Sequence, residues 1–269
     1  MISELMSLDG RVAVVTGAAG LLGQKHCEAL AEAGATVYAC DLSSKAATSV
    51  ANGLGPHHVG VALDVTDDES VLDLRSRLMD EHGGVDILVN NAAMNDMVEH
   101  HGPGSESSKF ENYPVGLFRQ VMDVNVTGVF LMSQIIGSIM ADAGKGSIIN
   151  IASTYGVVAP DQRLYLSPSG EQTFFKSVAY PTSKGAVIMM TKFIATYWGH
   201  RGIRANCLSP GGVENGQNEH FIKKYSDRTP LGRMAGSADY KGSLVFLASD
   251  ASRYMTGQNL IVDGGWTSW

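Results

Sequence analysis

The sequence predicts an α/β fold built on a doubly wound parallel sheet. Short apolar segments alternate with longer helical stretches along its 269 residues. The apolar segments are continuous runs and not apolar–polar alternations, which is typical of parallel strands covered by helices on both faces. The connections between them are long enough for the crossovers that parallel pairing requires.

The expected elements follow from this alternation. Strands are expected over Arg11–Thr16, Thr36–Cys40, Gly60–Leu63, Val85–Asn90, Ser147–Ala152, Ile203–Leu208 and Asn259–Val262. Helices are expected after Gly23 as far as Ala33, and over Asp67–His82, Val115–Ala143, Tyr180–His200 and Ala238–Ala248. Gly34 ends the first helix, because glycine readily takes the left-handed conformation of a helix C-cap.

Two stretches break the alternation, Ala92–Pro114 and Val157–Ala179. Loops of this length are uncommon in a compact domain and are typical of lids or binding loops. Both begin directly after an expected strand, at the sheet edge where open α/β folds bind ligands.

Composition limits the classes of function. A net charge of −7 argues against a nucleic-acid or anionic-membrane partner. The three cysteines form no CxxC motif, and His100-His101 has no third ligand at metal spacing, so no disulfide framework and no metal site is expected. The N-terminal residues show no signal-peptide pattern, and no uninterrupted apolar run reaches the roughly 18 residues of a membrane span, so we expect a cytoplasmic protein.

A glycine-rich turn, Thr16-Gly-Ala-Ala-Gly-Leu-Leu-Gly23, joins the first strand to the first helix, as in dinucleotide-binding sites. Gly17 permits the turn, Gly20 lets the backbone approach a pyrophosphate, and Gly23 permits close packing of helix on strand. Leu21 and Leu22 lie at the helix N-terminus, whose N–H groups and dipole favour phosphate. A turn that serves packing alone is the alternative.

Asp41 ends the second strand, 21 residues after Gly20, where a carboxylate accepts hydrogen bonds from adenosine ribose hydroxyls. It would repel a 2′-phosphate, and no Lys or Arg at residues 18–22 or directly after Asp41 offsets it. The sequence therefore favours NAD over NADP. Further cofactor contacts are expected at the same edge of the sheet, from Leu42, Asp64, Val65, Asn91, Ala92 and Ala93.

Tyr180 and Lys184 are four residues apart, so on a helix they share one face with Cβ atoms about 5–6 Å apart. A phenol with a pKa of about 10 is a poor base, but a nearby cation lowers that pKa towards the range useful for acid–base catalysis. Ser153, after the fifth strand, is expected to orient a substrate oxygen towards Tyr180. Asn125, inside a long helix, is expected to hold an ordered water near Lys184. A surface Tyr–Lys pair and a solvent-facing Asn are the alternatives.

Together these motifs resemble the short-chain dehydrogenase/reductase family over about residues 8–265. The resemblance also rests on Asn125-Val-Thr-Gly128, Ser209-Pro-Gly211 and Asp263-Gly-Gly265. It implies a single Rossmann-like domain over residues 1–269 and hydride exchange between NAD and an alcohol or carbonyl carbon. It implies Tyr180 as the acid/base, Lys184 as its pKa-lowering and ribose-binding partner, and Ser153 as the donor to the substrate oxygen. It further implies a water-linked proton relay through Asn125 and a nicotinamide contact by the backbone at Pro210, Gly211 and Val213.

Two features depart from the common family pattern. The turn reads TGxxGxxG, where members of this size usually have TGxxxGxG. Ser153 and Tyr180 are 27 residues apart, about twice the usual spacing. The extra residues, roughly Leu164–Val178, imply an added lid or pocket wall, and they leave Thr154 open as an alternative to Ser153.

The two long loops favour a polar, carbohydrate-like substrate. Their polar side chains are Asn95, Asp96, Glu99, His100, His101, Glu106, Lys109, Asp161, Gln162, Arg163, Glu171, Gln172 and Lys176. The segment Tyr155–Pro160 also resembles family members linked to carbohydrate and bacterial surface-glycan (flagellin-modification) pathways. We therefore predict an NAD(H)-dependent oxidoreductase that interconverts a secondary alcohol and a ketone. Relatives also lead us to expect a homodimer or homotetramer, paired through Val115–Ala143 and Tyr180–His200.

Two alternatives remain open. A 3-oxoacyl-carrier-protein reductase is disfavoured by Asp41 and by the negative charge, since such enzymes usually need NADPH and a basic docking patch. A catalytically silent, NAD-sensing binding protein would typically lack the tyrosine or the lysine, and this sequence has both.

Overall fold

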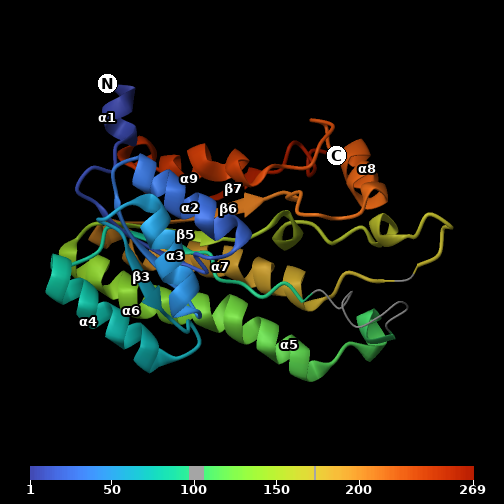
Figure 1. Cartoon of the computed structure of the whole chain (residues 1–269), viewed down its shortest axis with the longest axis horizontal. Helices are drawn as coiled ribbons and strands as arrows, with labels where there is room; N and C mark the ends of the chain where they lie inside the picture. Colours follow the sequence, from blue (N-terminus) through green and yellow to red (C-terminus); the bar gives the residue numbers. More distant parts are fainter. Residues whose placement is uncertain (97–105, 173) are drawn as a thin grey trace.

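Seven parallel strands form one sheet in the order β3-β2-β1-β4-β5-β6-β7 (Figure 1). This computed structural model describes residues 1–96, 106–172 and 174–269. The strands are β1 Val12–Thr16, β2 Thr36–Asp41, β3 Val59–Ala62, β4 Ile87–Asn90, β5 Gly146–Ile151, β6 Ile203–Pro210 and β7 Asn259–Val262. All seven lie at the positions that the sequence predicts, to within three residues at each end.

Helices cover both faces of the sheet (Figure 1). They are α1 Ile2–Met6, α2 Leu21–Glu32, α3 Ser44–Leu54, α4 Asp68–His82, α5 Val115–Met122, α6 Gly128–Ala143, α7 Ala179–Trp198, α8 Glu219–Arg228 and α9 Lys241–Ala248. On β1, Ala13 and Val15 pack in the cluster that includes α2 and α9, whereas Val14 packs in the cluster that includes α4 and α6. Both faces of β1 are therefore buried, which explains its continuous apolar run, whereas the edge strands β3 and β7 are only partly buried.

The direction of chain progression reverses at β1, which pairs with β2 on one side and β4 on the other. In such sheets the crossovers on the two sides of this point lead to opposite faces and leave a crevice at the carboxyl ends of the strands. The architecture thus places the glycine turn after β1 and the residues after β4 side by side.

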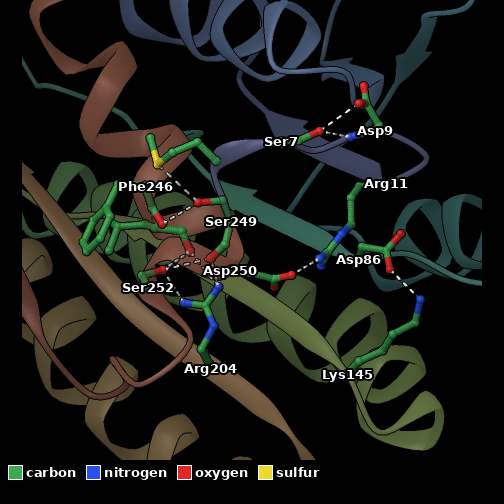
Figure 2. Close-up of polar contacts among 12 residues, drawn as sticks. Ser7, Asp9, Arg11, Asp86, Lys145, Arg204, Phe246, Ser249, Asp250 and Ser252 are labelled. Carbon is green, nitrogen blue, oxygen red and sulfur yellow. Dashed lines mark hydrogen bonds and ion pairs between the residues drawn. The ribbon is translucent and has the colours of Figure 1, made fainter. Parts of the chain in front are cut away.

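The opposite, amino-terminal edge of the sheet is closed by polar contacts (Figure 2). The Asp86 carboxylate, just before β4, accepts hydrogen bonds from the Val12 backbone N–H at 3.0 Å and from Lys145 Nζ at 2.8 Å. Arg204 Nη1 donates to Ser252 Oγ at 2.8 Å, and Arg11 pairs with Asp250 at 2.9 Å. These contacts join the beginnings of neighbouring strands to one another and to the segment after α9. The amino-terminal edge is therefore stabilised by polar contacts, whereas the cavity lies at the carboxyl edge.

Three helices, α1, α3 and α8, are absent from the sequence-based expectation, and α1 has only five residues. Helix α3 begins after Ser43, whose Oγ accepts a hydrogen bond from the Ala46 N–H. Helix α8 begins after Asn218, whose Oδ1 accepts from the Phe221 N–H at 2.8 Å. Both N-caps are ordinary sequence signals, but the helices are short, and α3 is rich in small and polar residues.

The long helix expected over Val115–Ala143 is interrupted by one π turn, Asp123–Thr127, between α5 and α6. By length and mean hydropathy, 1.6, this described stretch is apolar enough to cross a membrane. That differs from the expectation of no such segment, because Gly, Ser and Gln interrupt its apolar run without lowering the mean much. Met132, Ile136 and Met140 are fully buried in the core, so the stretch packs as a core helix of this fold.

Candidate active site

A cavity of about 1460 Å³ follows the carboxyl edge of the sheet. This is larger than the roughly 300–1,000 Å³ of a site for one small ligand, so it can hold a cofactor together with a substrate. Every residue predicted to contact the cofactor lines it: Gly17, Gly20, Leu21, Leu22, Gly23, Asp41, Leu42, Asp64, Val65, Asn91, Ala92, Ala93, Tyr180, Lys184, Pro210, Gly211 and Val213. Ser153 lines it as well, whereas Asn125 does not.

Two of the three glycines in the turn, Gly17 and Gly23, are required because a Cβ atom would collide with the backbone there. Gly17 has φ +61°, and a Cβ there would lie 2.8 Å from the Ala92 Cα. A Cβ on Gly23 would collide with the Gly17 carbonyl oxygen, so the first turn of α2 closes directly onto the loop. Gly20 is the N-cap of α2 and has no side chain to cap it. The N–H groups that begin α2 therefore border the cavity without a side-chain cap, which suits a phosphate group.

Asp41 and Asn91 fix the shape of this turn. Asp41 Oδ2 accepts a hydrogen bond from the Ala19 N–H at 3.0 Å. Asn91 Nδ2 donates to the carbonyl oxygens of Thr16 and Gly17, at 2.9 and 3.0 Å. Asp64 is held in a local turn, since its Oδ1 accepts from Thr66 N and Oγ1. These residues form a preorganised cradle at the adenosine end of the cavity, and they fit a dinucleotide.

Tyr180 is the second residue of α7 and is partly buried. Its side chain lies next to Ser153. Burial raises the pKa of the Tyr180 phenol, and a hydrogen bond with Ser153 acts in the opposite direction. The lowering expected from the sequence is therefore outweighed, because desolvation disfavours the phenolate more than the neighbouring groups favour it.

Ser153, and not Thr154, is the hydroxyl beside Tyr180. Ser153 is extended, with φ −168°, and also accepts a hydrogen bond from the Tyr155 N–H at 3.1 Å. The Thr154 hydroxyl instead donates to the Pro210 carbonyl oxygen at 3.0 Å. The long spacing between Ser153 and Tyr180 in the sequence therefore does not separate the two side chains in space.

Lys184 lies one helical turn after Tyr180 and is 3% exposed. Its Nζ donates to the Ile151 carbonyl oxygen at 2.7 Å and lies 5.6 Å from the centre of the Tyr180 ring. Burial lowers the pKa of Lys184 to about 8. The amine thus lies at the floor of the cavity, at the end of β5.

The side chain of Asn125 forms its hydrogen bonds with Met94 and with Ser183, the residue before Lys184. Its Oδ1 accepts from the Met94 N–H at 2.7 Å, and its Nδ2 donates to the Met94 carbonyl and to Ser183 Oγ, each at 3.0 Å. The fully buried amide is fully used in joining the chain after β4 to α7. Asn125 lies in the π turn, and its expected part in a water-linked proton relay stays a prediction.

The insertion after β5 reaches back to the site. Its 3-10 turn, Gln162–Tyr165, places Gln162 against the backbone of Lys176, and Lys176 extends into the cavity. Lys176 Nζ donates to Asn95 Oδ1 at 2.5 Å and lies 5.1 Å from the centre of the Tyr180 ring. The sequence identified Lys176 only as one polar residue of a loop wall.

Helix α8 covers the substrate end of the cavity together with the insertion, and Figure 1 shows both at the same end of the molecule. Asp161 forms ion pairs with Arg163 and with Arg228 of α8. Lys224 Nζ donates to the carbonyl oxygens of Arg163 and Leu166, at 3.3 and 3.1 Å. Sequence reasoning missed α8, although Phe221, Ile222 and Tyr225 have helical spacing after the Asn218 cap.

The loop 92–114 is described only in part. Glu99, His100 and His101, three of the polar residues assigned to the substrate wall, lie outside the described residues. Within the described residues there is no group of three or more His, Cys, Asp or Glu side chains that could hold a metal ion. The cysteines at 27, 40 and 207 are buried and free.

The chain is similar to known proteins over nearly its full length. A family model described as Enoyl-(Acyl carrier protein) reductase matches residues 17–267. The D-threitol dehydrogenase of Mycolicibacterium smegmatis is 36% identical, over 97% of this chain and 94% of that protein. The galactitol 2-dehydrogenase of Agrobacterium fabrum is 35% identical, over 98% of this chain and all of that protein.

Solved structures share the same architecture. A gluconate 5-dehydrogenase from Burkholderia cenocepacia, in complex with NADP and tartrate, superposes with a TM-score of 0.87 at 30% identity and covers 100% of both chains. A short-chain type dehydrogenase/reductase from Mycobacterium marinum has a TM-score of 0.85 at 33% identity, over 99% of both chains.

Proposed function

This chain belongs to the short-chain dehydrogenase/reductase family, and we propose that it is an NAD(H)-dependent enzyme that interconverts a secondary alcohol and a ketone on a polar, carbohydrate-like substrate. The observation that carries the proposal is the juxtaposition of Ser153, Tyr180 and Lys184 in the cavity that also contains the glycine turn. The glycine turn would hold the cofactor phosphates in the same cavity that Ser153, Tyr180 and Lys184 line.

In the direction of oxidation, the substrate hydroxyl lies between the hydroxyl groups of Ser153 and Tyr180. Ser153 donates a hydrogen bond to the substrate oxygen, and Tyr180 takes the hydroxyl proton as the C–H bond breaks. In reduction, Tyr180 returns the proton to the carbonyl oxygen. NAD, when bound, supplies the hydride acceptor or donor. Lys184, at the floor of the cavity, holds ribose hydroxyls and favours the phenolate electrostatically.

We propose NAD as the preferred cofactor because of Asp41. Its Oδ2 is fixed by the Ala19 N–H, so the carboxylate stays at the place where an adenosine ribose would lie. A 2′-phosphate there would meet a fixed negative charge. The NADP in the Burkholderia cenocepacia structure belongs to that protein, and the preference of this chain is measured directly by kcat/KM with each cofactor.

The carbohydrate-like substrate class is supported by two observations. The relatives described above carry names of polyol and sugar-acid dehydrogenases. The substrate end of the cavity carries amide and hydroxyl groups, from Asn215, Gln217 and Ser167 among others. Such walls bind several hydroxyl groups better than a long acyl chain.

A substrate panel tests the proposal. Purified enzyme is supplied with NAD and threitol, galactitol or gluconate, and in the reverse direction with NADH and a 3-oxoacyl thioester, with NADH absorbance as the readout. We expect turnover with at least one polyol or sugar acid. Turnover of the thioester alone would favour the acyl reductase alternative, which also has a relative here, a reductase of Thermotoga maritima at 32% identity.

We also propose a homo-oligomer formed through α7. Met189, Phe193 and Tyr197 lie on this helix and are each at least 60% exposed. Phe193 and Tyr197 stack with ring centres 5.8 Å apart. Light scattering on the purified chain measures the expected dimer or tetramer.

A further inference from the structure

Lys176 gives Tyr180 a second cation that the Tyr–Lys pair of α7 does not include. Its Nζ lies over the Tyr180 ring at 5.1 Å from the ring centre, closer than Lys184 Nζ at 5.6 Å. The Lys176 side chain is only 7% exposed. A cation over an aromatic face within about 6 Å is attracted to it, and the attraction is stronger where water is excluded.

The insertion holds Lys176 at two points. The Lys176 N–H donates to Gln162 Oε1 at 2.8 Å, and Gln162 Nε2 donates to the Lys176 carbonyl oxygen at 3.0 Å. Asn95 Oδ1, in the segment that follows β4, accepts from the Lys176 ammonium. The backbone is thus clamped by one side chain and the ammonium is aimed by another, so the position of the cation does not depend on a flexible stem alone.

The other titratable groups that face Tyr180 have opposing effects on the pKa of its phenol. Lys184 belongs to the same helix, α7. Asp96, after β4, and Tyr155, in the turn after β5, each raise the pKa of Tyr180, and the hydrogen bond with Ser153 lowers it. Asp96 in turn accepts a hydrogen bond from the Tyr113 hydroxyl. A phenolate at Tyr180 would therefore meet a nearby carboxylate, and a cation on the insertion side offsets it.

We propose that Lys176 is a positioning residue for catalysis: the insertion places its ammonium over Tyr180 to stabilise the phenolate form during turnover. This inference rests on the proposed role of Tyr180 as the acid/base. Lys176 does not exchange the proton itself, because its Nζ faces the ring and Asn95 while Ser153 occupies the hydroxyl side. Its contribution is electrostatic and appears in the pH dependence of the reaction.

The experiment measures kcat/KM for alcohol oxidation against pH in wild type and in Lys176→Met. Methionine keeps an unbranched apolar side chain and removes the charge. We expect the rising limb of the profile to move up by about one pH unit, the lower end of the usual effect of a nearby opposite charge. Well below the limb, kcat/KM then falls about tenfold, whereas the plateau at high pH is retained. Lys176→Arg keeps the cation and should restore most of the wild-type profile.

Two further measurements separate this role from a structural one. Ultraviolet difference spectroscopy follows tyrosinate formation without any substrate, and subtracting the curve of Tyr180→Phe isolates the titration of Tyr180. We expect this titration to move upward in Lys176→Met. Lys192→Met removes an exposed lysine from α7, the helix that carries Tyr180. It should leave both the pH profile and the Tyr180 titration unchanged. Gln162→Ala, which releases the clamp but keeps the charge, should give a smaller shift in the same direction.

A rising limb at the wild-type pH in Lys176→Met, with activity lowered equally at all pH values, overturns the inference and leaves Lys176 as a substrate contact or a structural residue. An unmoved Tyr180 titration overturns it as well. Wild-type turnover by Tyr180→Phe would instead overturn the proposed role of Tyr180, whatever the Lys176 variants do.

Discussion

The adenosine end and the substrate end of the cavity are built in different ways. The adenosine end consists of backbone and small residues at strand ends, held by contacts among segments that the sheet itself brings together, such as Asn91 with Gly17. The substrate end consists of long side chains from segments outside the sheet. Lys176 meets Asn95 across 81 residues of sequence, and Lys224 meets Arg163 across 61.

The adenosine end therefore depends on the common scaffold of this architecture, whereas the substrate end depends on segments particular to this chain. Strand order and the glycine turn define the cradle in which we propose the cofactor binds, so that end is expected to change little when the loops change. The substrate end rests on a long insertion and a ten-residue helix, the kind of surface segment that varies while the scaffold stays constant. Variants at the two ends should therefore affect different kinetic constants.

The largest effect is expected where the two ends meet. Tyr180→Phe removes the hydroxyl group that we propose exchanges the substrate proton but keeps the ring. We expect turnover to fall by about 10²–10⁴-fold, the usual contribution of general acid–base catalysis, while NADH binding, measured by fluorescence titration, stays within about twofold. A loss of NADH binding equal to the loss of turnover would instead make Tyr180 a structural part of the cofactor site.

Gly23→Ala tests the adenosine end. The added Cβ would collide with the Gly17 carbonyl oxygen, which belongs to the backbone and cannot move aside. We expect at least tenfold weaker NADH binding and a loss of about 1–3 kcal/mol of stability, as for other overpacked sites. Gly53→Ala is the matched control, because its Cβ would meet nothing within 4 Å; it should bind NADH normally and unfold at a slightly higher temperature.

Asp41→Asn sharpens the cofactor choice at the same end. The amide oxygen can still accept from the Ala19 N–H, so the turn keeps its shape while the charge is lost. We expect the ratio of kcat/KM for NADP to that for NAD to rise about tenfold, or ~1.4 kcal/mol. Asp68→Asn removes the same charge from an exposed site on α4 and should leave the ratio unchanged. A wild-type preference for NADP would contradict the argument from Asp41 altogether.

The smallest effect is expected at the substrate end. Asp161→Asn weakens the ion pair that joins the insertion to Arg228 on α8. Since a partly exposed pair contributes about 0.2–1 kcal/mol, we expect the substrate KM to rise by no more than about fivefold with NADH binding unchanged. Asp227→Asn breaks the exposed pair with Lys223 on the same helix and serves as the control. An equal change of NADH affinity in Asp161→Asn would show that the two ends are coupled.

The sequence by itself determined the sheet and the adenosine end. The strands are continuous apolar runs, and the glycines at 17 and 23 are required by local sterics, so a pattern within about ten residues was enough to predict them. Ser153, Tyr180 and Lys184 were predicted from motif spacing and lie in one cavity.

Only the tertiary structure decided which partners the side chains around Tyr180 contact and how deeply its phenol is buried. Asn125 has its amide consumed by Met94 and Ser183, and the phenol is desolvated more than the Tyr–Lys spacing suggests. The approach of Lys176 and the packing of α8 on the insertion depend on contacts between segments far apart in sequence. Closing such loops is governed by the summed packing of the whole fold and not by any local pattern, which is why the substrate end could not be predicted from the residues alone.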